Sequence, residues 1–342
     1  MSQRGPKPGD DSRPRHFRRT SGEVLVAVRR RRRVLVAGIP LGGVSVLLFS
    51  RSSFRFLIVG LLVLAACEKP RPVVVFGRDD FGDPVEIDQV PARIVSLSPA
   101  TTEILFALGA GDRVVGRSDF DLWPVEARQI PTLGNGLQPN VEAVLGTHPD
   151  LVILYASRDN RPAADRLRAA GVSTLALKND HISDFRRITE LLGTILRDSA
   201  RARTLTDSVF RTLERVRAAT AALPRPTVFW HIWDAPLITI GAGSFMNELV
   251  DIAGANNVYA ADITGPSKPI SLEDVARRNP DFILAGPIGA RKIAADPRWR
   301  IVRAARENKV LIVDTVLVAR PAVRLGEAAV SLANLLHPGA VR

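Results

Sequence analysis

The sequence predicts an α/β fold with two Rossmann-like lobes, each built on a parallel sheet and joined by a single long α-helix. Three observations lead to this fold class: an internal repeat at a constant offset of 131 residues, alternating helix and strand patterns within each copy, and an uninterrupted helical pattern between the copies. We expect lobes over residues 73–180 and 223–342, with the connecting helix over 181–222.

The repeat is a helix that leads into a buried strand. Residues 140–144 read Asn-Val-Glu-Ala-Val, and Pro-Asp-Leu-Val-Ile-Leu follows at 149–154. The second copy reads Ser-Leu-Glu-Asp-Val from residue 271 and Pro-Asp-Phe-Ile-Leu-Ala from residue 280. Asn and Ser are good N-caps, and a short apolar run after a Pro-Asp break is typical of a buried strand.

A second pair of segments precedes the two copies. Residues 103–110 and 248–255 each read as a helix that ends at a glycine. Strands are predicted directly before these helices, at 93–97 and 237–240. Because strand and helix alternate in both halves, we expect a parallel sheet in each lobe.

The segment between the copies has a helical pattern. Residues 184–220 contain no proline and one glycine, and their apolar side chains recur at helical spacing. A continuous helix of this length would span roughly 54 Å. A stiff connection of this kind predicts only modest movement of the lobes when a ligand binds.

The positive charge is concentrated at the start of the chain. The formal net charge is +12, from 47 Lys and Arg against 35 Asp and Glu. Residues 1–66 hold 13 of the basic and 3 of the acidic residues, which leaves 34 basic and 32 acidic residues in the remainder. The body is therefore nearly neutral, and we expect no nucleic-acid partner.

The basic prefix contains two apolar runs, at 34–49 and 56–66. Each follows arginines and is too short to span a membrane, as is typical of a secretory signal core. The second run ends in Leu-Ala-Ala-Cys, which resembles a bacterial lipobox and implies lipidation of Cys67, the only cysteine. We expect residues 1–67 to be a leader and the chain to be lipid-anchored, facing the periplasm or the exterior. The alternative is a soluble or membrane-tethered protein in which Cys67 is incidental.

Several stretches resemble the class III periplasmic substrate-binding proteins for cobalamin, siderophores and haem. The matching stretches are residues 93–105, 108–116, 141–145, 149–153, and the Arg-Pro pair at 320–321 near Arg324. The resemblance covers about residues 73–336. It implies a monomer with a ligand cleft between two lobes, which serves the permease and ATPase subunits of an ABC importer.

The ligand expected from the resemblance is cobalamin or a related corrinoid. Residues 118–124, Ser-Asp-Phe-Asp-Leu-Trp-Pro, look like the aromatic pocket loop of the cobalamin binders. However, residues 134–139 and 265–269 lack the tryptophans that those proteins have there. A ferric siderophore or haem is therefore the alternative cargo.

Aromatic and basic side chains are the candidate ligand contacts. Aromatic faces supply apolar area for a planar macrocycle, and guanidinium groups bind carboxylates or phosphates. The same aromatic residues could instead pack in the core, and the arginines could instead lie on a solvated surface. Ser98, Thr101 and Ser244 are N-cap candidates that can also donate to an acidic ligand group. The predicted ligand-binding residues are Phe120, Trp123, Trp230, Trp233, Arg320 and Arg324.

Glu142 and Glu273 occupy equivalent places in the two copies, each in the first turn of a predicted helix. A carboxylate there is favoured by the helix dipole alone. The family resemblance implies a further role, in which one glutamate from each lobe docks into arginine pockets of the membrane subunits.

The sequence carries no catalytic motif and no metal site of protein ligands. It lacks G-x-S-x-G, P-loop and H-E-x-x-H patterns, and its five histidines show no ligand spacing. We expect no enzyme activity and no cofactor, although the cargo itself can be a cobalt corrinoid or an iron chelate. His231 is a candidate axial ligand to such a metal. An α/β enzyme, or a sensory module that retains the fold without transport, would be a competing interpretation of the same fold.

Overall fold

The computed structural model describes residues 74–341. The predicted leader and Cys67 lie outside this range. Residues 70–342 form one compact unit. Among the described residues, no helix combines the length and the apolar character that crossing a membrane requires.

The N-terminal lobe is built on a four-stranded parallel sheet in the order β4-β3-β5-β6. A β-hairpin, β1 and β2, packs beside β6. The strands are β1 (Val74–Arg78), β2 (Pro84–Ile87), β3 (Ile94–Ser96), β4 (Val114–Arg117), β5 (Leu151–Tyr155) and β6 (Ser173–Leu177). The helices are α2 (Pro99–Ala107), η1 (Gly111–Arg113), η2 (Val125–Gln129), α3 (Val141–Gly146), η3 (Arg158–Asn160) and α4 (Arg161–Ala169).

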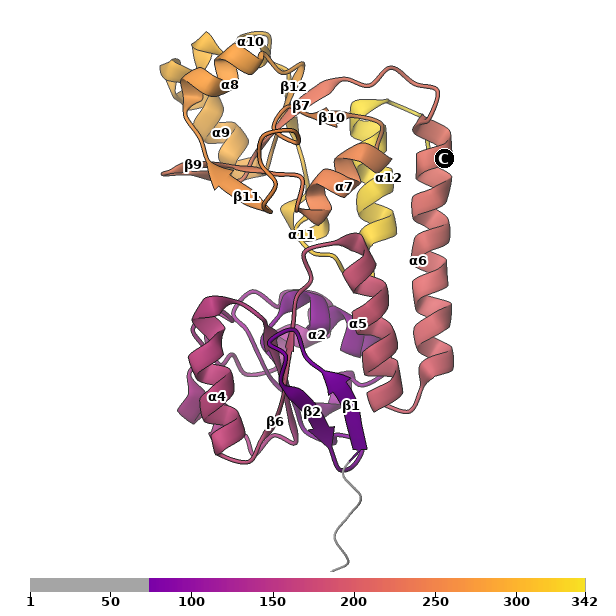
Figure 1. Ribbon diagram of the computed structural model, residues 1–342. Helices are drawn as coiled ribbons and strands as arrows, with labels where there is room; N and C mark the ends of the chain where they lie inside the picture. Colours follow the sequence, from indigo (N-terminus) through magenta and orange to yellow (C-terminus); the bar gives the residue numbers. More distant parts are fainter. Residues whose placement is uncertain (1–73, 342) are drawn as a thin grey trace, which may run out of the picture. The chain divides into compact units, whose positions relative to one another are not determined.

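The C-terminal lobe repeats this topology in the parallel order β10-β7-β12-β13. In both sheets the second strand along the chain lies outside the first, followed by the third and fourth. This shared order confirms the duplicated α/β architecture, and Figure 1 labels β7, β10 and β12 of the C-terminal sheet. The parallel strands are β7 (Thr227–His231), β10 (Asn256–Asn257), β12 (Phe282–Ala285) and β13 (Val310–Ile312). The helices are α7 (Phe245–Ile252), α8 (Leu272–Arg278), α9 (Pro287–Ala295), η4 (Pro297–Ile301), α10 (Arg303–Arg306), α11 (Thr315–Val318) and α12 (Leu325–Leu336).

The caps predicted from the repeat form as expected. Asn140 accepts a hydrogen bond from the Ala143 amide at the start of α3, and Ser271 accepts one from the Asp274 amide at the start of α8. Gly109 has a φ of 79°, the left-handed conformation that ends a helix.

One predicted strand forms, but its expected place in the parallel sheet is wrong. The segment 237–240 forms a strand, β9 (Leu237–Ile240), but it lies in a small antiparallel sheet between β8 (Trp233–Asp234) and β11 (Ser267–Pro269). The counterpart of β3 is β7, which is buried from its second residue onward. Leu237 and Ile238 are only half-buried, which suits an outer sheet rather than one covered on both faces.

The prediction of one continuous connecting helix is also wrong. The segment forms two antiparallel helices, α5 (Ile182–Ile195) and α6 (Ser199–Thr220), which pack on each other. The chain turns at Arg197, whose φ is 61°, and Asp198 caps α6. A Cβ on Gly193 would lie 2.4 Å from the Ala202 Cβ, so this glycine permits close packing of the pair. Folding back lets both helices bury their apolar faces.

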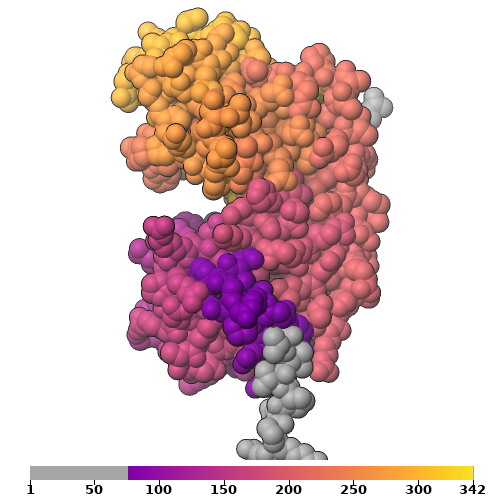
Figure 2. Space-filling view, in the orientation of Figure 1, coloured from indigo at the N-terminus to yellow at the C-terminus, as the bar shows by residue number. Residues whose placement is uncertain are grey.

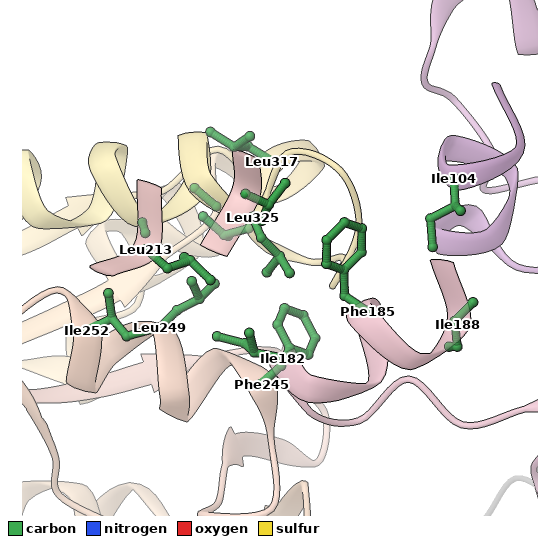
Figure 3. Close-up of a cluster of buried hydrophobic side chains, with 14 of the residues drawn as sticks. Ile104, Ile182, Phe185, Ile188, Leu213, Phe245, Leu249, Ile252, Leu317 and Leu325 are labelled. Carbon is green, nitrogen blue, oxygen red and sulfur yellow. The ribbon is translucent and has the colours of Figure 1, made fainter. Parts of the chain in front are cut away.

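The helices α5, α6, α7 and α12 carry one apolar core between the two sheets. This cluster joins Ile104 of α2 and Phe185 of α5 to Leu249 of α7 and Leu325 of α12 (Figure 3). The backbone adds a direct link, because the Phe245 amide donates to the Asp180 carbonyl at 2.6 Å. A shared core of this kind favours the modest lobe movement expected from the sequence.

Candidate functional site

A cavity lies where the carboxyl ends of the N-terminal strands meet the C-terminal lobe. This interlobe cavity has a volume of about 340 Å³. Ser98 follows β3, Ser118 follows β4, and Tyr155 ends β5, while Ser244 and Phe245 lie on the opposite wall. Figure 2 shows the surface hollowed between the magenta and orange parts of the chain. The carboxyl edge of a parallel sheet is the usual place for a ligand.

A second cavity lies at the corresponding edge of the C-terminal sheet. This C-terminal cavity has a volume of about 570 Å³ and is lined mainly by apolar side chains. Its walls come from the end of β7, from the first turns of α9 after β12, and from α11. Ala319 lines both cavities, so the two adjoin at this residue.

Three of the predicted aromatic residues line these cavities. Phe120 is 58% exposed and lines the interlobe cavity. Trp230 and Trp233 both line the C-terminal cavity, with 2% and 62% of their surface exposed. Trp123 instead lies beside the Arg324 guanidinium, whose carbon is 5.0 Å from the ring centroid. The exposed faces available to a ligand are therefore those of Phe120 and Trp233.

The two candidate arginines have partners within the chain. Arg320 donates to the Phe120 carbonyl at 2.7 Å and to Glu103 Oε1 at 3.4 Å. Arg324 donates to Glu327 Oε2 at 3.2 Å. Arg320 thus ties the segment between α11 and α12 to the N-terminal lobe and holds the loop that carries Phe120.

Two buried acids lie beside this arginine, and the sequence analysis did not single them out. Glu103 is 2% exposed and Asp121 is fully buried. Burial raises the pKa of Glu103 to about 7, although Arg320 acts in the opposite direction. Burial also raises the pKa of Asp121, against hydrogen bonds from Ser118 and Thr102. The sequence offered one signal for Glu103, because this acid precedes the apolar residues 104–105 in a predicted helix.

The polar lining of the interlobe cavity includes Ser98 and Ser244, which were named from sequence, and Tyr155 and Asp180, which were not. Tyr155 donates to Asp180 Oδ1 at 2.7 Å, and burial followed by this bond raises the pKa of the Tyr155 phenol. Ser244 also lines the cavity, but its hydroxyl caps α7 by accepting from the Met246 amide. Ser98 makes no side-chain cap bond, and the Thr101 hydroxyl donates to the Ser98 carbonyl.

Comparison with known proteins identifies the family. The model of the periplasmic binding protein family matches residues 94–317. The chain belongs to this family. It is 29% identical over 304 residues to the uncharacterized ABC transporter substrate-binding lipoprotein YvrC of Bacillus subtilis (strain 168), covering 82% of this chain and 95% of that protein. It is 29% identical over 287 residues to a cobalamin-binding protein of Halobacterium salinarum (strain ATCC 29341 / DSM 671 / R1), covering 80% of this chain and 75% of that one.

The fold is shared with solved structures of the same class. A periplasmic haem-binding protein from Pseudomonas aeruginosa superposes with a TM-score of 0.66 at 25% identity, covering 73% of this chain and 94% of that one. The class III two-lobed fold and the ABC-transporter type of binding protein are therefore confirmed. Proteins of this family bind substrates for transport, work with permease and ATPase components, and are not a class of enzymes.

The two predicted docking glutamates lie exposed in the first turns of α3 and α8. Their environments differ. Glu142 forms an ion pair with Arg166 of α4, and its own backbone amide followed by Arg166 lowers the pKa of its carboxyl group. Glu273 lines a hollow of about 750 Å³ together with Leu272 and Ile301.

Within residues 74–341, no group of three or more His, Cys, Asp or Glu residues is placed to hold a metal ion. His231 lies at the end of β7, and its side chain is 3% exposed. In this conformation so little of the ring is accessible that axial coordination to the metal of a bulky macrocycle is sterically unfavourable.

Proposed function

We propose that this protein captures cobalamin or a related corrinoid between its lobes and delivers it to the permease of an ABC importer. The observation that carries the proposal is the pair of adjoining cavities, which present the exposed faces of Phe120 and Trp233 at the carboxyl edges of the two sheets. Flat aromatic faces with a few polar groups suit a large, planar, amphipathic ligand. The likeness to the halobacterial cobalamin-binding protein supports the same cargo.

The first experiment is a calorimetric titration of the full chain, purified in detergent, with cyanocobalamin and cobinamide. Saturable binding of either ligand supports a corrinoid cargo. Trp233→Ala is expected to weaken that binding about tenfold. In the wild type the exposed aromatic face of Trp233 is expected to become buried against the ligand, and the alanine variant lacks this contact. Ile312→Ala is the control, since Ile312 is 57% exposed and lies outside both cavities. Equal affinity in wild type and Trp233→Ala would contradict the proposed role of this tryptophan.

A haem or ferric-siderophore cargo is the second candidate. It is favoured by the structural likeness to the haem-binding protein from P. aeruginosa. The same titration with haem and a ferric siderophore separates the candidates. Response to either iron ligand, with none to the corrinoids, would place the protein in an iron importer.

We also propose that Cys67 is lipidated and anchors the protein to the membrane. The Leu-Ala-Ala-Cys sequence and the likeness to a substrate-binding lipoprotein support this anchor. Cys67→Ser is expected to shift the protein from the membrane fraction to the soluble fraction and to abolish incorporation of labelled palmitate. Unchanged labelling in this variant would contradict the proposal.

A further inference from the structure

The apolar C-terminal cavity has a polar corner formed by His231, Asp234 and Lys292, to which the proposed function assigns no role. Trp233, Ile288 and Val318 are among its apolar lining residues. Asp234 and Lys292 lie together in the same lining, next to His231. Charged groups in a mainly apolar cavity are the features that fix a ligand's orientation and chemical class.

The polar corner is a chain of three groups that runs from the protein interior to solvent. His231 Nε2 lies 2.8 Å from Asp234 Oδ1, and Asp234 Oδ2 accepts from Lys292 Nζ at 2.6 Å. The side chains are 3%, 33% and 59% exposed, in that order. Because each carboxylate oxygen has its own partner, Asp234 cannot rotate freely, and it holds the Lys292 ammonium at one position.

Packing fixes the inner end of this chain. The His231 ring lies edge-on to Trp299, with centroids 5.9 Å apart. A Cβ on Gly289 would lie 2.7 Å from His231 Nδ1, so α9 approaches the ring closely only because this residue is glycine. Nδ1 itself has no hydrogen-bond partner among the described residues. The imidazole is therefore held in place by this packing at the start of α9.

The first turn of α9 adds unpaired donors to the same cavity. Gly286 caps this nine-residue helix without a side chain, and Pro287 at its first position has no N–H. The amides of Ile288 and Gly289 find no acceptor within residues 74–341. Both residues line the cavity. A helix N-terminus with free amides favours negative charge, and Lys292 lies one turn further along the same helix.

We propose that Lys292 and the first turn of α9 bind an anionic oxygen group of the cargo, a carboxylate or a phosphodiester, while its apolar body lies against Trp233. An ammonium has three donors, and Asp234 occupies one of them, which leaves donors for a ligand. Asp234 and His231 are positioning residues, because they act on the ligand through Lys292. This inference rests on the proposed function and adds the chemical class of ligand group that the site selects.

The test uses pairs of ligands that differ in the anionic group. Haem is compared with its dimethyl ester, which lacks charged propionates, and cyanocobalamin with cobinamide, which lacks the phosphodiester together with the ribose and base attached to it. Affinities are measured by calorimetry on the full chain in detergent. Lys292→Gln is expected to weaken the anionic member of the bound pair about tenfold and to leave the neutralised member unchanged. Lys292→Arg is expected to retain most of the affinity.

Two further variants sharpen the test. Lys268→Gln removes an exposed lysine from the same lobe, outside both cavities, and is expected to change neither affinity. Asp234→Asn is expected to reduce the preference for the anionic member without changing affinity for the neutralised member, which loss of folding would not reproduce.

The possible outcomes distinguish a failure of the anion-binding inference from a failure of the proposed function. A loss confined to haem assigns a carboxylate, and a loss confined to cyanocobalamin assigns a phosphodiester. The inference is overturned if Lys292→Gln binds each ligand as the wild type does, or if it weakens both members of a pair equally. A wild-type chain that binds none of the four ligands overturns the proposed corrinoid or haem cargo, and the inference with it.

Discussion

Replacing both Glu142 and Glu273 with arginine is expected to abolish cargo uptake while leaving cargo affinity unchanged. The two carboxylates are exposed at equivalent positions of the duplicated lobes, which suits a partner with two similar binding sites. Reversal places like charges against the arginine pockets that the family resemblance implies in the permease. Like-charge contacts at an interface cost several kcal/mol, enough to prevent assembly.

Uptake of labelled cargo into cells, together with calorimetry on the purified variants, checks this prediction. The matched control is Glu86→Arg with Glu307→Arg, which reverses one exposed carboxylate in each lobe away from the first turns of α3 and α8. The control is expected to support uptake. Normal uptake by the Glu142/Glu273 double variant, or a loss of cargo affinity in it, would contradict the docking role.

The unfolding free energy should fall by about 3 kcal/mol as the pH rises from about 4.5 to 7, through the titration of Glu103. Burial raises the pKa of this carboxyl group from 4.5 to about 7. In this window the folded chain therefore keeps a proton that the unfolded chain releases. Glu103 stabilises the fold most fully below pH 4.5, and this contribution is lost as the pH rises through 7.

Urea unfolding of wild type and Glu103→Gln at a series of pH values isolates this effect. The Gln variant does not titrate, so the stability of the wild type relative to it should decrease between about pH 4.5 and 7 and then level off. Glu126→Gln, which removes an exposed carboxyl group from the same lobe, should track the wild type throughout. A wild-type to Glu103→Gln difference that is constant over this range would show that Glu103 does not titrate in this way.

The helix caps and buried strands could be predicted because their sequence pattern occurs in both copies of the repeat. The caps at Asn140 and Ser271 and the strands after the two Pro-Asp breaks depend on neighbouring residues, and all of them form. Recurrence at a fixed offset then implied two sheets of one topology. Phe120 and Trp233 were likewise named from sequence as candidate ligand contacts, but their role in binding stays a prediction.

The turn between α5 and α6 could not be predicted, because it depends on packing. The apolar spacing continues through Arg197 and Asp198, and no proline interrupts it. In the structure, the gain from packing the two helices against each other favours the turn over a continuous helix. The same limit applies to residues 237–240, whose apolar pattern suits a strand in either kind of sheet.

The sequence by itself determined the duplicated α/β topology, the exposure of Glu142 and Glu273, for which docking is a prediction, and the family. Tertiary structure alone decided which side chains meet across long separations. It pairs Arg320 with Glu103, 217 residues away, and it places Lys292 beside Asp234, 58 residues away. Helical and strand periods reach only a few residues along the chain, whereas these contacts join different elements that only the fold brings together: Glu103 lies in α2, Lys292 in α9 and Asp234 in β8.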